Sequence, residues 1–242
     1  MVFAYIMPTF SVSHLGGQLT SPRTVYGNIL FAPALQRGHL FTLRIFMILG
    51  LTGAFGGGKS TVLSYFAQRN WHTFDADSAC HKIYASGERE LLENLKNIFG
   101  LQAVRADGSI DRRQIAAQLF ASPEKKQALS DMLYPRLNAM MNSEIDHCRK
   151  NNINGVFELP LLYEAGFENS FDAIMAIWSD PAVRAERLAG RNFSADDMKE
   201  RDRNQLDPFE KLERADFAVI NNGSKAALYA QLDKFADTVE KK

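Results

Sequence analysis

A glycine-rich segment constrains the fold more than any other part of the sequence. Residues Gly53 to Ser60 fit the pattern G-x-x-x-x-G-K-[ST]. A continuous apolar run, Ile45 to Thr52, precedes the segment and predicts a strand buried on both faces. Helical spacing of apolar residues follows over Ser60 to Arg69. A glycine-rich turn with an incidental lysine is the alternative, but the strand before and the helix after favour a phosphate-binding loop.

The loop predicts a site for ATP. Glycines allow backbone angles that point successive N–H groups at an anion, and the following helix adds its positive N-terminal end. We expect Lys59 to reach the β- and γ-phosphates and the hydroxyl of Ser60 to ligate Mg²⁺. The predicted nucleotide-binding residues are Gly53, Ala54, Phe55, Gly56, Gly57, Gly58, Lys59, Ser60 and Thr61.

The rest of the chain alternates between strand and helix patterns. Further strands are expected at Trp71–Phe74, Gly155–Leu159, Ala173–Trp178 and Phe217–Asn221, with helices at Pro181–Ala189 and Ser224–Val239. Residues 79–150 have helical spacing and no strand pattern; Gly100 is expected to cap one helix, Pro123 to stand near the start of another, and Pro135 to interrupt it. The pattern predicts an α/β fold of P-loop NTPase type, a parallel sheet flanked by helices, with a helical insertion.

Composition limits the classes of function. The formal net charge is +0, which argues against extended binding to a nucleic-acid backbone. Two cysteines, Cys80 and Cys148, are too few for a disulfide framework and indicate free thiols in a reducing compartment. No apolar run approaches the roughly 20 residues that cross a bilayer. We therefore expect a cytoplasmic protein that acts on a small molecule.

The first 46 residues differ from the rest, because they contain no Asp or Glu and are rich in Ser, Thr, Gly and Phe. We interpret residues 1–46 as a leader that is disordered or an artefact of the start site, with synthesis beginning at Met47. A transit peptide is the second interpretation.

Carboxylates follow two of the expected strands. Asp75 and Asp77 come after the second strand, and ligands of such sheets bind at the carboxyl ends of the strands. We assign a helix-capping role to Asp75 and the orientation of an acceptor hydroxyl to Asp77. Glu158, at the end of the third strand, could orient a water bound to Mg²⁺.

Five arginines lie close together at positions 184, 187, 191, 201 and 203. Arginines can neutralise the charge that develops during phosphoryl transfer, and we expect at least one of them to face ATP. Acidic residues are interleaved with them, so an exposed helix held by ion pairs is the alternative. Arg187 and Arg191 are the candidates for catalysis.

Taken together, the motifs resemble the dephospho-coenzyme A kinase family over roughly residues 47 to 240. The resemblance is carried by the opening I-L-G-L-T-G-A-F-G-G-G-K-S-T, Asp75-Ala76-Asp77, the stretch from Gly108 to Arg113, P-L-L-Y-E at 160–164, Arg201 to Gln205, and A-D-F-A-V-I-N-N-G at 215–223. It implies phosphorylation of the ribose 3′-hydroxyl of dephospho-coenzyme A, with ATP and Mg²⁺ as cofactors and Asp77 as the catalytic aspartate.

The resemblance also implies a division of the chain. Residues 47–78 and 151–242 would form the nucleotide-binding core, 79–150 a helical coenzyme A domain, and 181–208 a lid. Substrate contacts are expected from Asp77, Arg112, Tyr134, Pro135, Leu161 and Glu164. The family usually has His-Pro where this chain has Tyr134-Pro135, and the loop has Gly-Ala-Phe in place of the commoner Gly-Gly-Ile.

Two other functions are open at this point. One is a kinase for another small acceptor, such as a nucleoside monophosphate. The other is a non-enzymatic nucleotide-binding switch, but such switches usually read guanine through an N-K-x-D-type motif, and none stands at an expected strand end.

Overall fold

The computed structural model describes residues 24–26, 29–31, 46–119, 122–191 and 193–240. The chain divides into two compact units. Residues Phe74–His147 form one unit, and the described residues on either side of this segment form the other. The two units are described in turn.

The larger unit is built on a sheet with the strand order β1-β2-β7-β6-β3-β5-β4. Strand β3 (Ile48–Gly53) pairs in parallel with β5 (Gly155–Glu158) and β6 (Ala173–Trp178), and β6 pairs in parallel with β7 (Phe217–Ile220). The predicted parallel sheet is confirmed. Because the chain continues to strands on both sides of β3, the carboxyl end of β3 is the place where a ligand is expected to bind.

Three further strands extend the sheet at its edges. Strand β4 (His72–Asp75) lies beyond β5. At the other edge β2 (Ile29–Phe31) pairs antiparallel with β7, and β1 (Thr24–Tyr26) pairs antiparallel with β2. Both short strands fall within the segment that the sequence predicts to be a leader, and the other residues of that leader, apart from Phe46, lie outside the described residues.

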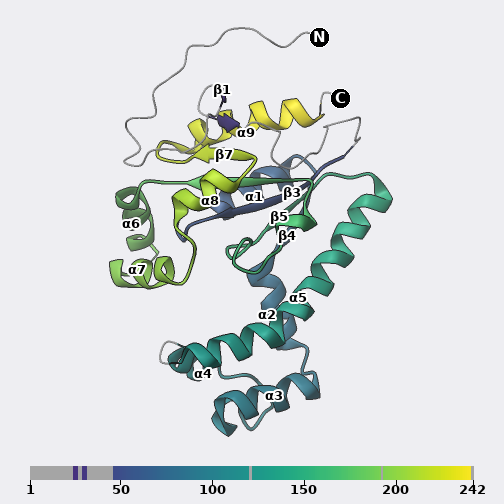
Figure 1. Ribbon diagram of the computed structural model, residues 1–242, viewed down its shortest axis with the longest axis vertical. Helices are drawn as coiled ribbons and strands as arrows, with labels where there is room; N and C mark the ends of the chain where they lie inside the picture. Colours follow the sequence, from purple (N-terminus) through teal and green to yellow (C-terminus); the bar gives the residue numbers. More distant parts are fainter. Residues whose placement is uncertain (1–23, 27–28, 32–45, 120–121, 192, 241–242) are drawn as a thin grey trace. The chain divides into compact units, whose positions relative to one another are not determined.

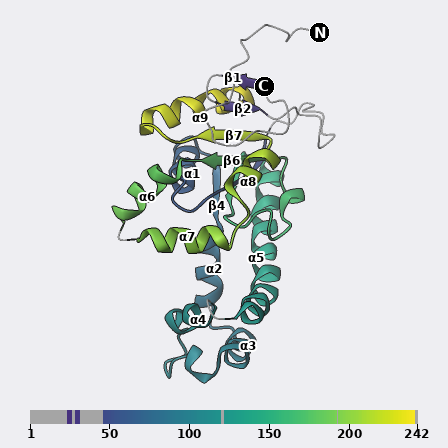
Figure 2. The ribbon, with the colours of Figure 1, turned by 60° about the vertical axis from the view of Figure 1, so that its left-hand side comes forward.

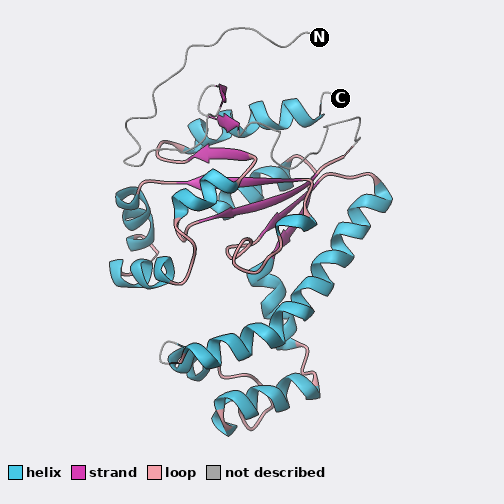
Figure 3. Cartoon of the chain, viewed as in Figure 1, coloured by secondary structure: helices cyan, strands magenta, loops and turns pink. Residues whose placement is uncertain are grey.

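Helices cover both faces of the sheet (Figures 1 and 3). On one face, α1 (Lys59–Gln68) and α9 (Lys225–Glu240) pack against alternate strand residues in a buried cluster that includes Leu49, Phe66 and Phe235. On the opposite face α8 (Pro208–Arg214) places Phe209 against Trp178, with ring centroids 5.6 Å apart. This burial on both faces explains why the strands are continuous apolar runs.

The segment between β6 and α8 forms a helical pair, seen together in Figures 1 and 2. Helix α6 (Pro181–Ala189) has the predicted bounds and begins at Asp180, whose carboxylate accepts a hydrogen bond from the N–H of Ala182. Helix α7 (Ala195–Arg203) begins with a capping box between Ser194 and Asp197. Sequence periodicity did not predict α7, because only Met198 of this charged helix is buried.

The smaller unit is helical. It contains α2 (Ala76–Ala85), α3 (Arg89–Phe99), the 3-10 turn η1 (Leu101–Ala103) and α4 (Arg112–Leu119), and it includes most of α5 (Pro123–Asn151). A second 3-10 turn, η2 (Glu168–Ser170), belongs to the larger unit. Gly100 ends α3 with a positive φ of 88°, as predicted.

The predicted interruption at Pro135 is wrong, because α5 runs through this residue without a break. A proline inside a helix costs about 3 kcal/mol or more. Five buried apolar residues recur at a spacing of four along the helix: Leu129, Leu133, Leu137, Met141 and Ile145. Burial of each contributes about 1.5–3 kcal/mol, so their sum exceeds the cost of the proline.

Among the helices in the part of the chain that the structure describes, none is both long enough and apolar enough to cross a bilayer.

Candidate nucleotide-binding site

The glycine-rich loop connects the carboxyl end of β3 to the first residue of α1. Gly56 and Gly58 have φ angles of 77° and 104°, in the left-handed region that favours glycine. Gly58 is the N-cap residue of α1, and its carbonyl accepts hydrogen bonds from the N–H groups of Thr61 and Val62. The loop therefore has the backbone of an anion nest at a helix N-terminus.

The ammonium group of Lys59 is buried beside the loop. Its Nζ donates hydrogen bonds to the carbonyls of Gly53 at 3.1 Å and Ala54 at 3.2 Å. Oε1 of Glu158, at the end of the neighbouring strand β5, lies 3.9 Å from the same Nζ. Side chains of Lys59 and Glu158 are only 9% and 11% exposed, so charge and hydrogen bonding must compensate for their desolvation. Lys59 and Glu158 are thus brought together at the loop.

Hydroxyl oxygens lie at the start of α1. Ser60 is exposed and Thr61 is half-buried in the first turn of the helix. Mg²⁺ prefers such hard oxygen ligands and carboxylates. Ser60 and the carboxylate of Glu158 are therefore the groups of this unit whose chemistry and placement next to the loop fit a divalent cation.

Two arginines of the α6–α7 segment contact Phe55 of the loop. Nη1 of Arg184 donates to the carbonyl of Phe55 at 3.2 Å. The guanidinium of Arg201 lies 3.9 Å from the centroid of the Phe55 ring and 5.1 Å from that of Phe193. The rings of Phe55 and Phe193 meet edge-on with centroids 5.1 Å apart. Phe55 therefore holds this segment by its side chain, a contact that its predicted role in the loop did not include.

The five clustered arginines have different environments. Arg184 is buried and forms a two-point ion pair with Asp202, at 2.9 and 2.8 Å, that joins α6 to α7. Arg187 donates to Ser179 and Asn221, next to the loop. Arg191 and Arg203 are exposed. Arg184 thus forms an ion pair, but a buried one and not one on the exposed helix face of that alternative, whereas Arg187 lies beside the loop.

Asp75, the last residue of β4, and Asp77 in the first turn of α2 belong to the helical unit. The carboxylate of Asp75 accepts hydrogen bonds from the N–H groups of Asp77 and Ser78 and from the Ser78 hydroxyl, so it caps α2. The capping role predicted for Asp75 is confirmed. Asp77 lies in the first turn of α2 and is exposed.

The other expected substrate contacts are distributed over both units. In the helical unit, Arg112 begins α4 with its guanidinium 5.7 Å from the ring centroid of Tyr84, whose pKa is raised to about 12, mainly by burial. Tyr134 and Pro135 lie in the middle of α5. In the larger unit, Leu161 is half-buried after β5.

Glu164 forms a charged contact that sequence reasoning missed. Lys211 of α8 is 1% exposed, and its Nζ lies 2.9 Å from Oε1 of Glu164. The same Nζ donates to the carbonyl of Pro160 at 2.6 Å and to Oε1 of Gln205 at 3.2 Å. Burial lowers the pKa of Lys211, and Glu164 acts in the opposite direction. The partners of Lys211 are up to 51 residues away in sequence, so no local pattern indicates them.

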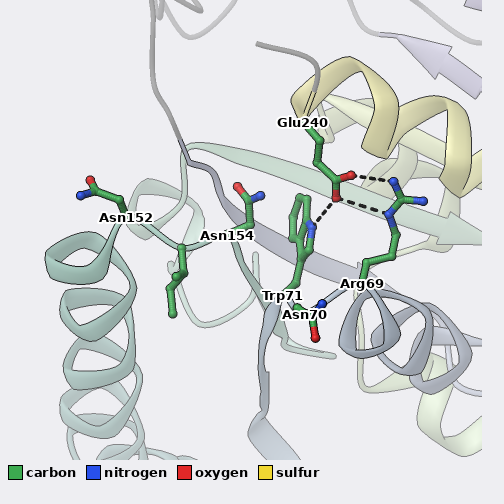
Figure 4. Close-up of a pocket in the computed structure, with 7 residues that line it drawn as sticks. Arg69, Asn70, Trp71, Asn152, Asn154 and Glu240 are labelled. Atoms are coloured by element: carbon green, nitrogen blue, oxygen red, sulfur yellow. Dashed lines mark hydrogen bonds and ion pairs between the residues drawn. The ribbon is translucent and has the colours of Figure 1, made fainter.

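A pocket of about 470 Å³ lies at the ends of the strands opposite to the glycine-rich loop (Figure 4). Trp71 precedes β4 and Asn154 precedes β5, so the pocket is at the amino ends of these strands. The indole N–H of Trp71 and the guanidinium of Arg69 both donate to Glu240, which fixes the end of α9. The loop and this pocket are separate sites of one unit.

A buried lysine within a glycine-rich loop, at the carboxyl ends of parallel strands, defines the class of P-loop nucleotide-binding proteins. Comparison with known proteins gives the family. The family model of dephospho-CoA kinase matches residues 47–227. The chain therefore belongs to the dephospho-CoA kinase family.

Individual relatives agree with this assignment. A dephospho-CoA kinase of Streptococcus pyogenes serotype M1 is 33% identical over 187 residues, which cover 77% of this chain and 94% of the relative. One of Enterococcus faecalis is 30% identical over 191 residues, covering 78% and 96%. The crystal structure of a Thermus thermophilus protein matches with a TM-score of 0.67 and 27% identity, covering 80% of this chain and 97% of the other. A dephospho-CoA kinase from Campylobacter jejuni matches with 0.63 and 26% over the same shares.

Proposed function

We propose that this protein transfers the γ-phosphoryl group of ATP to the ribose 3′-hydroxyl of dephospho-CoA, the step that completes coenzyme A. Membership of the dephospho-CoA kinase family is the observation that carries the proposal. The loop supplies the physical support, since its two left-handed glycines and its buried lysine can bind the phosphates of a nucleoside triphosphate.

Lys59 is proposed to follow the phosphates. In the structure its ammonium is bound to the carbonyls of Gly53 and Ala54 and lies beside Glu158. A phosphate in the loop offers stronger acceptors than neutral carbonyls, so the flexible side chain would exchange these partners for phosphate oxygens. There its charge would oppose the negative charge of the transferring group.

Ser60 and Glu158 are the proposed holders of Mg²⁺. Mg²⁺ neutralises phosphate charge when it is bound. Ser60 contributes a hydroxyl oxygen from the first turn of α1, and Glu158 contributes a buried carboxylate that would hold a metal-bound water. Arg187 is proposed to add a fixed positive charge beside the loop.

The acceptor is proposed to be held by the helical unit. Asp77, exposed at the start of α2, would accept a hydrogen bond from the 3′-hydroxyl and orient it for attack. Arg112 and Tyr134 of the same unit are the proposed substrate contacts, with Pro135 fixing the backbone next to Tyr134. Leu161 and Glu164 are proposed to contact substrate from the larger unit, and Arg191 remains a candidate for the phosphates.

Release of ADP over a panel of acceptors tests the function. We expect dephospho-CoA to stimulate ADP release in the presence of ATP and Mg²⁺, and mass spectrometry to show a phosphate added to dephospho-CoA. Stimulation by a nucleoside monophosphate instead would assign a different acceptor. Slow hydrolysis that no acceptor stimulates would contradict a kinase and favour a nucleotide-binding switch.

A further inference from the structure

The carbonyl of Gly57 in the glycine-rich loop receives two hydrogen bonds from outside the loop. The hydroxyl of Ser179 lies 3.1 Å from it and shares its single proton between this carbonyl and that of Asn221 at 2.8 Å, and Nδ2 of Asn221 donates to the Gly57 carbonyl at 2.9 Å. Ser179 directly follows β6 and Asn221 directly follows β7. Their exposed fractions are 2% and 6%, so both contacts are made in a desolvated environment.

The same two side chains hold Arg187 of α6. Nη1 of Arg187 donates to the Ser179 hydroxyl at 3.1 Å, and Nη2 donates to Oδ1 of Asn221 at 3.3 Å. Gly57, Ser179, Asn221 and Arg187 therefore form a closed ring of hydrogen bonds. The guanidinium and the loop do not touch within this ring but are joined by a hydroxyl on one side and an amide on the other.

The orientation of the Asn221 amide follows from its partners. A carbonyl oxygen can only accept a hydrogen bond, and a guanidinium can only donate. A flipped amide would place its oxygen against the carbonyl of Gly57 and its NH₂ against Arg187, two repulsive contacts. Only this orientation satisfies both neighbours, so the Asn221 amide bonds to the loop and to Arg187 at the same time.

Anchoring the Gly57 carbonyl also sets the direction of an N–H group. In a trans peptide the carbonyl of one residue and the N–H of the next point in opposite directions. With the Gly57 carbonyl held by Ser179 and Asn221, the N–H of Gly58 points away from them. A side chain on Gly58 would overlap Nδ2 of Asn221, so the packing here leaves no space for a Cβ.

We propose that Ser179 and Asn221 are positioning residues that align the Gly58 N–H for phosphate binding and fix Arg187 beside the loop. The proposal rests on the proposed kinase function, since it assigns the loop to a nucleotide. Neither residue need touch the substrate, because both act through Gly57 and Arg187. A movement of α6 is then coupled to the orientation of the Gly57 carbonyl through one hydroxyl and one amide.

Removal of each group tests the ring. Ser179→Ala and Asn221→Leu each delete one donor to Gly57 and one acceptor for Arg187, Ser179→Ala also removes the donor to the Asn221 carbonyl, and neither adds a charge. We expect the affinity for ADP, measured by calorimetry, to fall about ten-fold in Asn221→Leu, since a buried carbonyl and a guanidinium lose partners. The ADP affinity should fall less in Ser179→Ala than in Asn221→Leu. Ser179→Thr keeps the hydroxyl and should have the ADP affinity of the parent protein.

Gln231→Leu is the matched control. Gln231 of α9 is also a buried amide, 5% exposed, and it bonds to both the N–H and the carbonyl of Ile220, next to Asn221 in sequence. Its hydrogen bonds within the described residues go to Ile220 and Ala227 and not to the loop, so Gln231→Leu should lower the melting temperature and leave ADP affinity unchanged. If Asn221→Leu behaves like Gln231→Leu, with lower stability and normal ADP affinity, the proposal is overturned.

A double-mutant cycle separates the two arms of the ring. If Asn221 acts partly through Arg187, the loss of kcat in Asn221→Leu and Arg187→Ala should be smaller in combination than the product of the single losses. Fully multiplicative losses would show that Asn221 does not act through Arg187. Failure of the parent protein to phosphorylate dephospho-CoA would contradict the proposed function, whereas ADP affinity tests the ring without that reaction.

Discussion

At the scale of the residue, the loop makes Lys59 the side chain with the clearest expected effect. Its ammonium is buried, bound to two loop carbonyls and close to the carboxylate of Glu158. It carries its charge at the point where a nucleotide would bring several negative charges. Removing it deletes a favourable charge from the site and leaves Glu158 without this neighbour.

Lys59→Ala is therefore expected to reduce kcat by about 10²–10³-fold, in the range seen when one group that stabilises transition-state charge is removed. Steady-state ADP release measures the loss. Lys234→Ala, at an exposed position of α9, is the control and should leave kcat unchanged. Near-normal turnover by a folded Lys59→Ala protein would remove Lys59 from the catalytic machinery.

Asp75 at the end of β4 and Asp77 in the first turn of α2 offer a matched pair of variants. Asp75→Asn keeps an oxygen that can cap α2, so its activity should stay near that of the parent protein. Asp77→Asn keeps the shape of the side chain but removes its charge, and we expect a large fall in kcat with only a modest change in the KM for ATP. Equal effects of the two substitutions would contradict this division of roles. A raised KM for ATP with a normal kcat would instead assign Asp77 to the Mg²⁺–nucleotide.

At the scale of the element, helices α6 and α7 are tied to the loop through Phe55. Arg184 bonds to its carbonyl, Arg201 stacks on its ring, and Phe193 meets the ring edge-on. The sequence located the arginine segment and predicted α6, but it could not assign the roles of single arginines. Those roles depend on Asp202, Ser179, Asn221 and Phe55, whose distances along the chain no helical period encodes.

Phe55→Ile should loosen α7 without changing the backbone of the loop. A cation–π contact contributes about 0.5–2 kcal/mol and an aromatic pair about 0.5–1.5 kcal/mol. We expect faster hydrogen exchange over 195–203 without nucleotide, and protection restored by an ATP analogue. Lys199→Ala, on the exposed side of α7, should exchange like the parent protein. Unchanged exchange in Phe55→Ile would show that the Arg184–Asp202 ion pair is sufficient to hold the segment.

At the scale of the whole molecule, the sequence predicted best what is local. The strands β3, β5, β6 and β7 and the loop follow from apolar runs and glycine spacing, and their positions are confirmed. The predicted interruption at Pro135 is wrong because burial of one face of α5 outweighs the cost of a proline inside a helix. Strands β1 and β2 were missed, since each has three residues and its pairing, to β7 in the case of β2, is set by a distant part of the chain.

The contribution of β1 and β2 can be measured with two truncated proteins, one starting at Thr24 and one at Met47. The described residues of the loop, of α6 and of the ring around Gly57 all follow Met47, whose N–H is held by the side chain of Asn154 at 2.7 Å. We therefore expect the protein starting at Met47 to keep the kcat and KM of the full chain. It should lose a few degrees in melting temperature, because hydrogen bonds between β2 and β7 contribute about 1 kcal/mol each. The protein starting at Thr24 keeps this pairing and should have the same melting temperature as the full chain.

If the protein starting at Met47 keeps the melting temperature of the full chain but loses kcat, β2 supports the site through β7 and Asn221. If both proteins melt far below the full chain, residues 1–23 contribute to the fold, and their interpretation as a leader is wrong.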